Sequence, residues 1–124
     1  MNFIFGAEYT RADIHAALGG NPQSYLPVKA GVVVAACLRL DLNPGAPHVV
    51  LYGSGPTIRK AGDLLAGQSQ PVPMFIKRAP QHWEYQGLFK VAGSFTAPVD
   101  CAPYVDGSGR ALVEISRVIL LEPA

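Results

Sequence analysis

The chain has 124 residues and a formal net charge of +1, and 49% of its residues are hydrophobic against 15% charged. This length and composition predict one folded domain, residues 1–124, and argue against a disordered chain. The near-neutral charge argues against a protein that holds DNA mainly through its backbone, since such proteins are usually far more basic. A nucleic-acid site would have to be a local patch or a shaped cavity.

Local signals along the chain predict short strands with two helices. Thr10 is a typical N-cap and Gly19-Gly20 a typical stop for the first helix, and Pro56 suits the first turn of the second. The predicted elements in chain order are a short apolar strand or lead-in (3–5), a helix (10–18), a polar loop (21–27), a valine-rich buried strand (31–40), a turn cluster (41–47), a strand (48–52), a helix (56–66), a strand (72–77), a long strand bent at Gly87 (82–95), a loop (101–111) and a closing strand (115–123).

The two cysteines give little support for a metal or redox site. Cys37 lies in the apolar run "GVVVAACLRL" and is expected to be a core thiol, while Cys101 lies in a proline-rich loop. Two cysteines alone form no metal site, and a disulfide between them is allowed but not required. We expect no cofactor, no leader peptide, no membrane partner and a cytoplasmic location.

The stretch "HVVLYGSGP" (48–56) places a glycine turn between a strand and a helix. Backbone N–H groups at such a turn can hold a phosphate. The stretch is not a P-loop, because no Gly-Lys-Ser/Thr follows, and it lacks the third glycine of a dinucleotide fingerprint. A phosphate site, the wall of a base pocket and a plain structural turn all remain open on these residues.

Catalytic spacing is missing, whereas one segment has the composition of a nucleic-acid surface. The three histidines are scattered, and Ser54 is not in a nucleophile elbow. We therefore expect a protein that is not an enzyme, with a hydrolase assembled from distant residues as the weaker interpretation. The segment "FIKRAPQHWEYQGLF" combines Lys77 and Arg78 with Trp83 and Tyr85, which suits stacking and charge. A plain hairpin with solvated cations is the competing interpretation.

The order of five motifs resembles the SRA (YDG) domain, most closely the version fused to HNH nucleases in bacterial restriction systems. The motifs are "GAEYTRADIHAALGGNPQ", "GVVVAACL", "VVLYGSGP", "PVPMFIKRAPQHWEYQGLFKVAG" and "SRVILLEP". The resemblance implies an α+β fold, a PUA-like or SRA-like curved β-barrel with two or three short helices. Two departures are that the aromatic residue of "VVLYGSGP" is shifted by one position and that the acidic segment before it is replaced by "RLDLNPGAP".

The resemblance also implies a function, the recognition of a modified base, such as a methylated one, that is flipped out of a DNA duplex. Such a domain would serve defence or restriction, with a nuclease as a separate partner. The alternative is a PUA-like module for RNA, a nucleotide or a protein. The site would comprise a pocket (Asp41, Tyr52, Gly53, Ser54 and Gly55), phosphate-binding cations (Arg59, Lys60, Lys77 and Arg78) and a stacking or wedging ring (Trp83).

Overall fold

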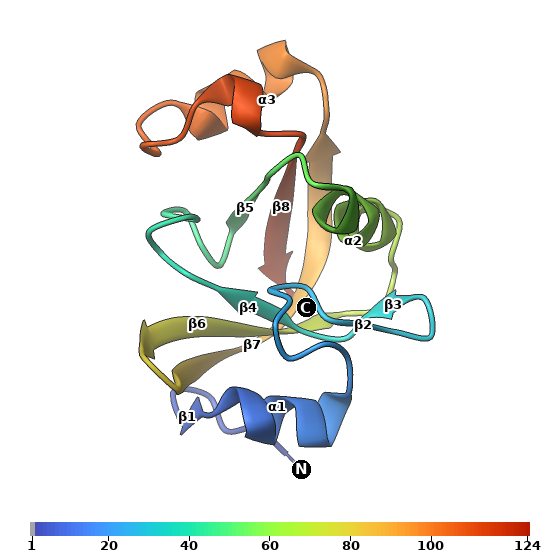
Figure 1. The fold of residues 1–124 in the computed structure, drawn as a ribbon, viewed down its shortest axis with the longest axis vertical. Helices are drawn as coiled ribbons and strands as arrows, with labels where there is room; N and C mark the ends of the chain where they lie inside the picture. Colours follow the sequence, from blue (N-terminus) through green and yellow to red (C-terminus); the bar gives the residue numbers. More distant parts are fainter. Residues whose placement is uncertain (1) are drawn as a thin grey trace.

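A curled sheet with helices packed around it forms the centre of the fold (Figure 1). The computed structural model describes residues 2–124. The elements in chain order are β1 (Glu8–Tyr9), α1 (Arg11–Leu18), β2 (Val28–Lys29), β3 (Val32–Val33), β4 (Ala36–Leu38), β5 (Val49–Tyr52), α2 (Pro56–Ala66), β6 (Val72–Ala79), β7 (His82–Phe95), α3 (Pro98–Val105), a single 3₁₀ turn (Leu112–Glu114) and β8 (Arg117–Pro123).

The sheet is an open half-barrel whose two edge strands follow each other in the chain. Its strand order is β4-β6-β7-β8-β5, and β1 adds to β7 outside this path. The pairing of β4 with β6 is parallel, and the other pairings are antiparallel. Within residues 2–124 no strand pairing joins β4 to β5, so the loop between them spans the open side of the sheet. The predicted α+β class and the curvature of the sheet are confirmed.

The curvature arises from irregular pairing along the longest strand. Gly87 has a φ of +97°, and the register of β7 against β6 shifts there, because Met74 faces Gly87 while Phe75 faces Tyr85. Glycine tolerates this conformation, and such a bulge sharpens the local twist. A second shift between Val91 and Gly93 lies in the half of β7 that pairs with β8. The predicted bend at Gly87 is confirmed.

The helices cover the sheet in the way their sequences predict. Thr10 caps α1, where its hydroxyl oxygen accepts from the Asp13 N–H at 3.1 Å and the Asp13 carboxylate accepts from the Thr10 N–H at 3.2 Å. The inner face of α2 buries Ala61 and Leu65 in the largest apolar cluster, as predicted. A second cluster joins Ile14 of α1 to the sheet.

Two of the predicted segments differ most clearly from the structure. The run 31–40 is not one strand, because its first part, β3, pairs with β2 across the turn at Ala30 and Gly31, whereas β4 pairs with β6, and residues 34–35 belong to neither strand. The predicted loop 101–111 overlaps α3, which forms although Pro103 lies inside it. The buried side chains of Cys101 and Val105 attach α3 to the outer side of β5 and β8, and this packing outweighs the weak helix signal.

Candidate functional site

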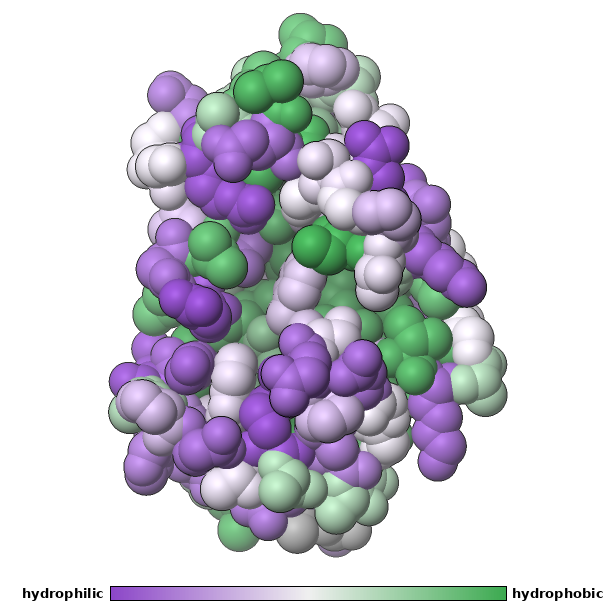
Figure 2. All heavy atoms as spheres, viewed as in Figure 1, coloured by the Kyte–Doolittle hydropathy of each residue, from purple (hydrophilic) through white to green (hydrophobic). Residues whose placement is uncertain are grey.

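A large cavity opens at the gap between the two edge strands. Its volume is about 860 Å³, and it is lined by residues of α1, β4, β5, α2, the β6–β7 hairpin and the loops between them. Figure 2 shows this face of the molecule hollowed between its upper and lower parts, with hydrophilic side chains around an apolar interior. The cavity therefore exists because the half-barrel does not close between β4 and β5.

The Lys and Arg side chains that line the cavity make its lining positively charged. Arg11, Arg39, Lys77 and Arg110 line it, and none of its lining residues is Asp or Glu. Arg39 is paired on the exposed rim with Asp41 at 2.6 Å, and its hydrogen bond holds the pKa of that carboxyl below its usual value. Among residues 2–124 no ion pair involves the other three cations. The cavity is therefore suited to an anionic ligand.

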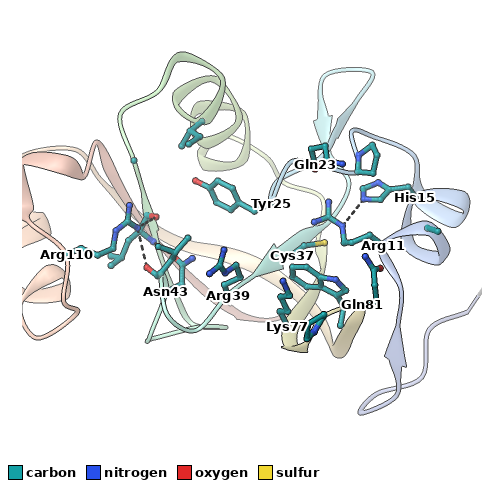
Figure 3. Close-up of a pocket in the computed structure, with 18 residues that line it drawn as sticks. Arg11, His15, Gln23, Tyr25, Cys37, Arg39, Asn43, Lys77, Gln81 and Arg110 are labelled. Atoms are coloured by element: carbon teal, nitrogen blue, oxygen red, sulfur yellow. Dashed lines mark hydrogen bonds between the residues drawn. The ribbon is translucent and has the colours of Figure 1, made fainter.

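One end of the cavity holds two of these cations beside an aromatic ring. Arg11 donates from Nε to Nε2 of His15 at 3.0 Å and from Nη2 to the Ser24 carbonyl at 2.6 Å (Figure 3). Its guanidinium carbon lies 5.1 Å from the ring centre of Trp83, and the Lys77 ammonium lies 5.7 Å from it. Both are within the range of cation–π attraction, so the cations are held in place before any ligand binds.

At the other end, side chains satisfy the free edge of β5. The Leu51 N–H donates to Oδ1 of Asn43 at 2.9 Å, and the Leu51 carbonyl accepts from Nη1 of Arg110 at 3.1 Å. The same Nη1 donates to the Leu42 carbonyl at 3.2 Å. An unpaired strand edge needs such partners when it is not exposed to water. Arg110 is therefore fixed by carbonyl groups rather than by a carboxylate, and its positive charge is not neutralised.

The middle of the cavity is neutral and partly apolar. Tyr25 lies between the two cationic ends (Figure 3), and burial raises the pKa of its hydroxyl, an effect that Arg110 opposes. Burial also raises the pKa of the Cys37 thiol to about 12, so this group is protonated at neutral pH. Leu51 and Ile58 add apolar surface. A ligand with anionic ends and a flat or apolar centre matches this arrangement.

The structure brings three of the ten predicted site residues to this cavity, and they are Gly53, Lys77 and Trp83. Asp41 lies on its rim beside Arg39. Tyr52 is fully buried in the core, on a smaller cavity of about 220 Å³ that Arg59 also lines. The remaining four do not line either cavity, and they are Ser54, Gly55, Lys60 and Arg78.

Several cavity residues were not among the predicted site residues. Arg11 lies in the motif "YTRADIH" at the first position of α1, where the sequence predicts only a helix. Tyr25 and Asn43 lie in loops, and Arg110 follows a loop whose Gly107 and Gly109 have positive φ. The capped helix was a usable signal for Arg11, because it fixes the direction of that side chain. No spacing in the sequence links Arg110 to the others.

Two features are absent from the part of the chain that the structure describes. No group of three or more His, Cys, Asp or Glu side chains there could hold a metal ion. No described helix combines the length and apolar character that crossing a membrane requires.

The fold and the cavity together define an α+β domain with an open half-barrel and a cationic cavity at its open side. Residues 8–101 match the family described as "Domain of unknown function (DUF6697)", and the chain belongs to this family. No curated protein matches the chain, and no solved structure matches it. The matched range includes Arg11, Arg39 and Lys77, whereas Arg110 lies beyond it.

Proposed function

We propose that this domain is a non-catalytic nucleic-acid recognition module that takes one nucleotide, extruded from its strand, into the cationic cavity. The observation that supports this most directly is a cavity of about 860 Å³ with three cations outside any ion pair of the described residues and no carboxylate in its lining. This volume lies in the usual range for small-molecule sites, and an extruded base is typically held in a closely fitting pocket.

The composition of the cavity favours a nucleotide over a small inorganic anion. Tyr25 offers a hydroxyl group and an aromatic ring beside the apolar surface of Leu51 and Ile58. A base needs such a surface as well as polar contacts to its edge, whereas an inorganic anion needs only the cations. We further propose that the ligand is a modified base in duplex DNA and that the fold is a PUA-like or SRA-like barrel. The proposal also includes a nuclease as a separate partner and a cytoplasmic location.

The ionisable groups of the cavity support binding rather than catalysis. The Cys37 thiol is protonated at neutral pH because burial raises its pKa to about 12, so it is a poor nucleophile. Both ring nitrogens of His15 are engaged, since Nε2 accepts from Arg11 and Nδ1 lies 2.8 Å from the Gly19 carbonyl. With no carboxylate in the lining, the cavity has no evident general base.

The net charge favours a second candidate, in which the same cavity binds a free nucleotide or a nucleotide of RNA. Outside the cavity the chain has six Lys and Arg (10 − 4) against nine Asp and Glu, so it has no excess of positive charge there to neutralise the phosphates of a long duplex. A short single strand or a free nucleotide places fewer charges outside the cavity and so requires fewer such cations. A protein ligand, the third alternative from the sequence, would not need cations gathered inside a cavity.

A matched pair of charge substitutions tests the proposal. Gln23 lines the cavity, while Gln70 is exposed and does not line either cavity. Gln23→Glu adds a negative charge to the cavity without changing side-chain volume, and we expect it to weaken binding by at least about tenfold, a change of roughly 1.4 kcal/mol. Gln70→Glu should leave binding within about twofold of wild type. Fluorescence anisotropy with labelled DNA and RNA oligonucleotides, single-stranded and duplex, measures both.

Base extrusion needs its own readout. A duplex with 2-aminopurine beside a 5-methylcytosine should brighten when the protein is added, because extrusion of the methylated base removes a stacking neighbour of the probe. Brightening with wild type but not with Gln23→Glu supports extrusion into this cavity. Equal binding by wild type and Gln23→Glu would overturn the proposal, and cavity-dependent binding to RNA or mononucleotides without brightening would favour the second candidate.

A further inference from the structure

The cations outside ion pairs lie at two separate ends of the cavity. In Figure 3 Arg110 lies at one end and Arg11 with Lys77 towards the other, and Tyr25 and Arg39 lie between them. Arg39 is neutralised by Asp41, so the positive charge is concentrated at the ends. Arg110 and the Arg11–Lys77 pair therefore form two positive regions, with Tyr25 and the neutralised Arg39 between them.

Each end also keeps hydrogen-bond donors that the protein does not use. Arg110 uses Nη1 for two carbonyl groups, which leaves Nε and Nη2 without a partner among residues 2–124. Arg11 donates from Nε to the His15 ring and from Nη2 to backbone carbonyls, which leaves Nη1 without a partner among residues 2–124. The Lys77 ammonium makes no hydrogen bond to a described residue, although it lies beside the Trp83 ring. Donors on a fixed guanidinium suit phosphate oxygens, which accept charge-assisted hydrogen bonds.

We propose that the cavity binds its nucleotide through two phosphate groups at once, one at Arg110 and one at Arg11 and Lys77. The ligand is then a nucleotide phosphorylated on both its 5′ and 3′ sides, which is an internal unit of a strand rather than a free monophosphate. This inference rests on the proposed function and specifies its ligand. Arg110 is the specificity-determining residue, because without it only one phosphate subsite remains.

The second subsite comes from a different part of the chain than the first. Arg11 and Lys77 lie within the range 8–101 that matches the family, and Arg110 lies beyond it. Arg110 reaches the cavity because α3 packs on β5 and β8 and the following loop returns to the edge of β5. The C-terminal segment therefore adds the contact that distinguishes a nucleotide with two phosphates from one with a single phosphate.

The affinities of three small ligands would distinguish the two phosphate subsites. Isothermal titration calorimetry at constant ionic strength would compare deoxycytidine 5′-monophosphate, the 3′-monophosphate and the 3′,5′-bisphosphate. We expect wild type to bind the bisphosphate at least about tenfold more tightly than either monophosphate, since one charge-assisted phosphate contact corresponds to about that ratio. In Arg110→Met the bisphosphate should lose this advantage, while one monophosphate keeps its affinity. Lys90→Met is the matched control, because Lys90 is paired with Glu122 on the surface.

The test compares the dissociation constants of the mono- and bisphosphate for the same variant, so partial unfolding does not change their ratio. Arg110→Met removes two hydrogen bonds to backbone carbonyls, and a smaller folded fraction would weaken all three ligands equally. Arg110→Lys, which keeps the charge, should retain most of the preference. Equal affinity of wild type for the mono- and bisphosphates, or an unchanged preference in Arg110→Met, would overturn the two-phosphate inference while leaving nucleotide binding intact. Failure of all three ligands to bind wild type would overturn the proposed function as well.

Discussion

The side chains of Tyr25 and Tyr52 are neighbours, with ring centres 6.0 Å apart, but they have different surroundings. Tyr25 lies on the large cavity, whereas Tyr52 is fully buried beneath α2. The Tyr52 hydroxyl has no hydrogen-bond partner among the described residues, and burial raises its pKa well above the usual value. Its ring contributes apolar packing, while its hydroxyl is left unsatisfied.

This difference between ring and hydroxyl predicts opposite results for two substitutions. Tyr52→Phe removes an unsatisfied buried hydroxyl and should leave the free energy of unfolding unchanged or raise it by up to about 1 kcal/mol. Tyr52→Ala removes the ring and should lower it by about 3–5 kcal/mol, by analogy with other large aromatic side chains. Urea unfolding followed by circular dichroism measures both. A loss of more than about 1 kcal/mol in Tyr52→Phe would mean that the hydroxyl has a partner in solution.

The buried thiol of Cys37 makes the free energy of unfolding depend on pH in the alkaline range. Burial raises the pKa of its thiol from 9.0 to about 12, so above pH 9 the unfolded chain releases this proton while the folded chain keeps it. The stabilisation is therefore complete below pH 9 and is lost as the pH rises towards 12. Between about pH 8.5 and 10.5, wild type should lose roughly 1–2 kcal/mol more unfolding free energy than Cys37→Ala. Parallel pH dependence of the two proteins would show that the thiol ionises in the folded state.

At the scale of elements, α2 and β5 approach each other closely at Gly62. A Cβ atom added there would lie 2.9 Å from Cδ2 and 3.2 Å from Cε2 of the Tyr52 ring. The sequence alone suggests that Gly62 weakens α2, because glycine costs about 1 kcal/mol relative to alanine inside a helix. The contact with Tyr52 gives this glycine a packing role instead.

Gly62→Ala should therefore lower the free energy of unfolding by about 1–3 kcal/mol, because overpacking the contact outweighs the gain in helix propensity. In a Tyr52→Leu background the ring is absent, and there the same substitution should be neutral or stabilising. Urea unfolding of the four proteins in this cycle gives the coupling energy. Stabilisation by Gly62→Ala in the wild-type background would show that the ring moves aside at little cost.

Elements with strong local signals were predictable from the sequence, and those defined by packing were not. Neighbouring residues alone determine the capping box at Thr10, the apolar face of α2 and the bend at Gly87. The sequence therefore predicts these features. The helix α3 forms despite the proline inside it, because Cys101 and Val105 pack against residues of distant strands. The cationic cavity has the same origin, since only the strand order brings Arg11 and Arg110 to opposite ends of one cavity.

At the scale of the whole molecule, the near-neutral charge limits binding to nucleic acid. The three cavity cations outside ion pairs predict a slope of about −3 in a plot of log affinity against log salt concentration for duplex DNA. Lys77→Met should reduce the magnitude of this slope by about one. Arg78→Met should leave it unchanged, because Arg78 is paired with Glu84 at 3.0 Å. Submicromolar binding to unmodified duplex at physiological salt, or a much steeper slope, would reveal cations outside the cavity that contact phosphates.

The strand order has a consequence for how the chain folds as it is synthesised. The strand β5 lies in the first half of the sequence, but its only sheet partner within the described residues is β8, the last strand. A nascent chain therefore holds the apolar residues Val50 and Leu51 without a strand partner until almost all of the domain has left the ribosome. Closing so long a loop is slow, and an unpaired apolar strand is open to aggregation in the meantime. Pairing with β8 therefore completes the sheet and, in the same step, gives this apolar strand its partner.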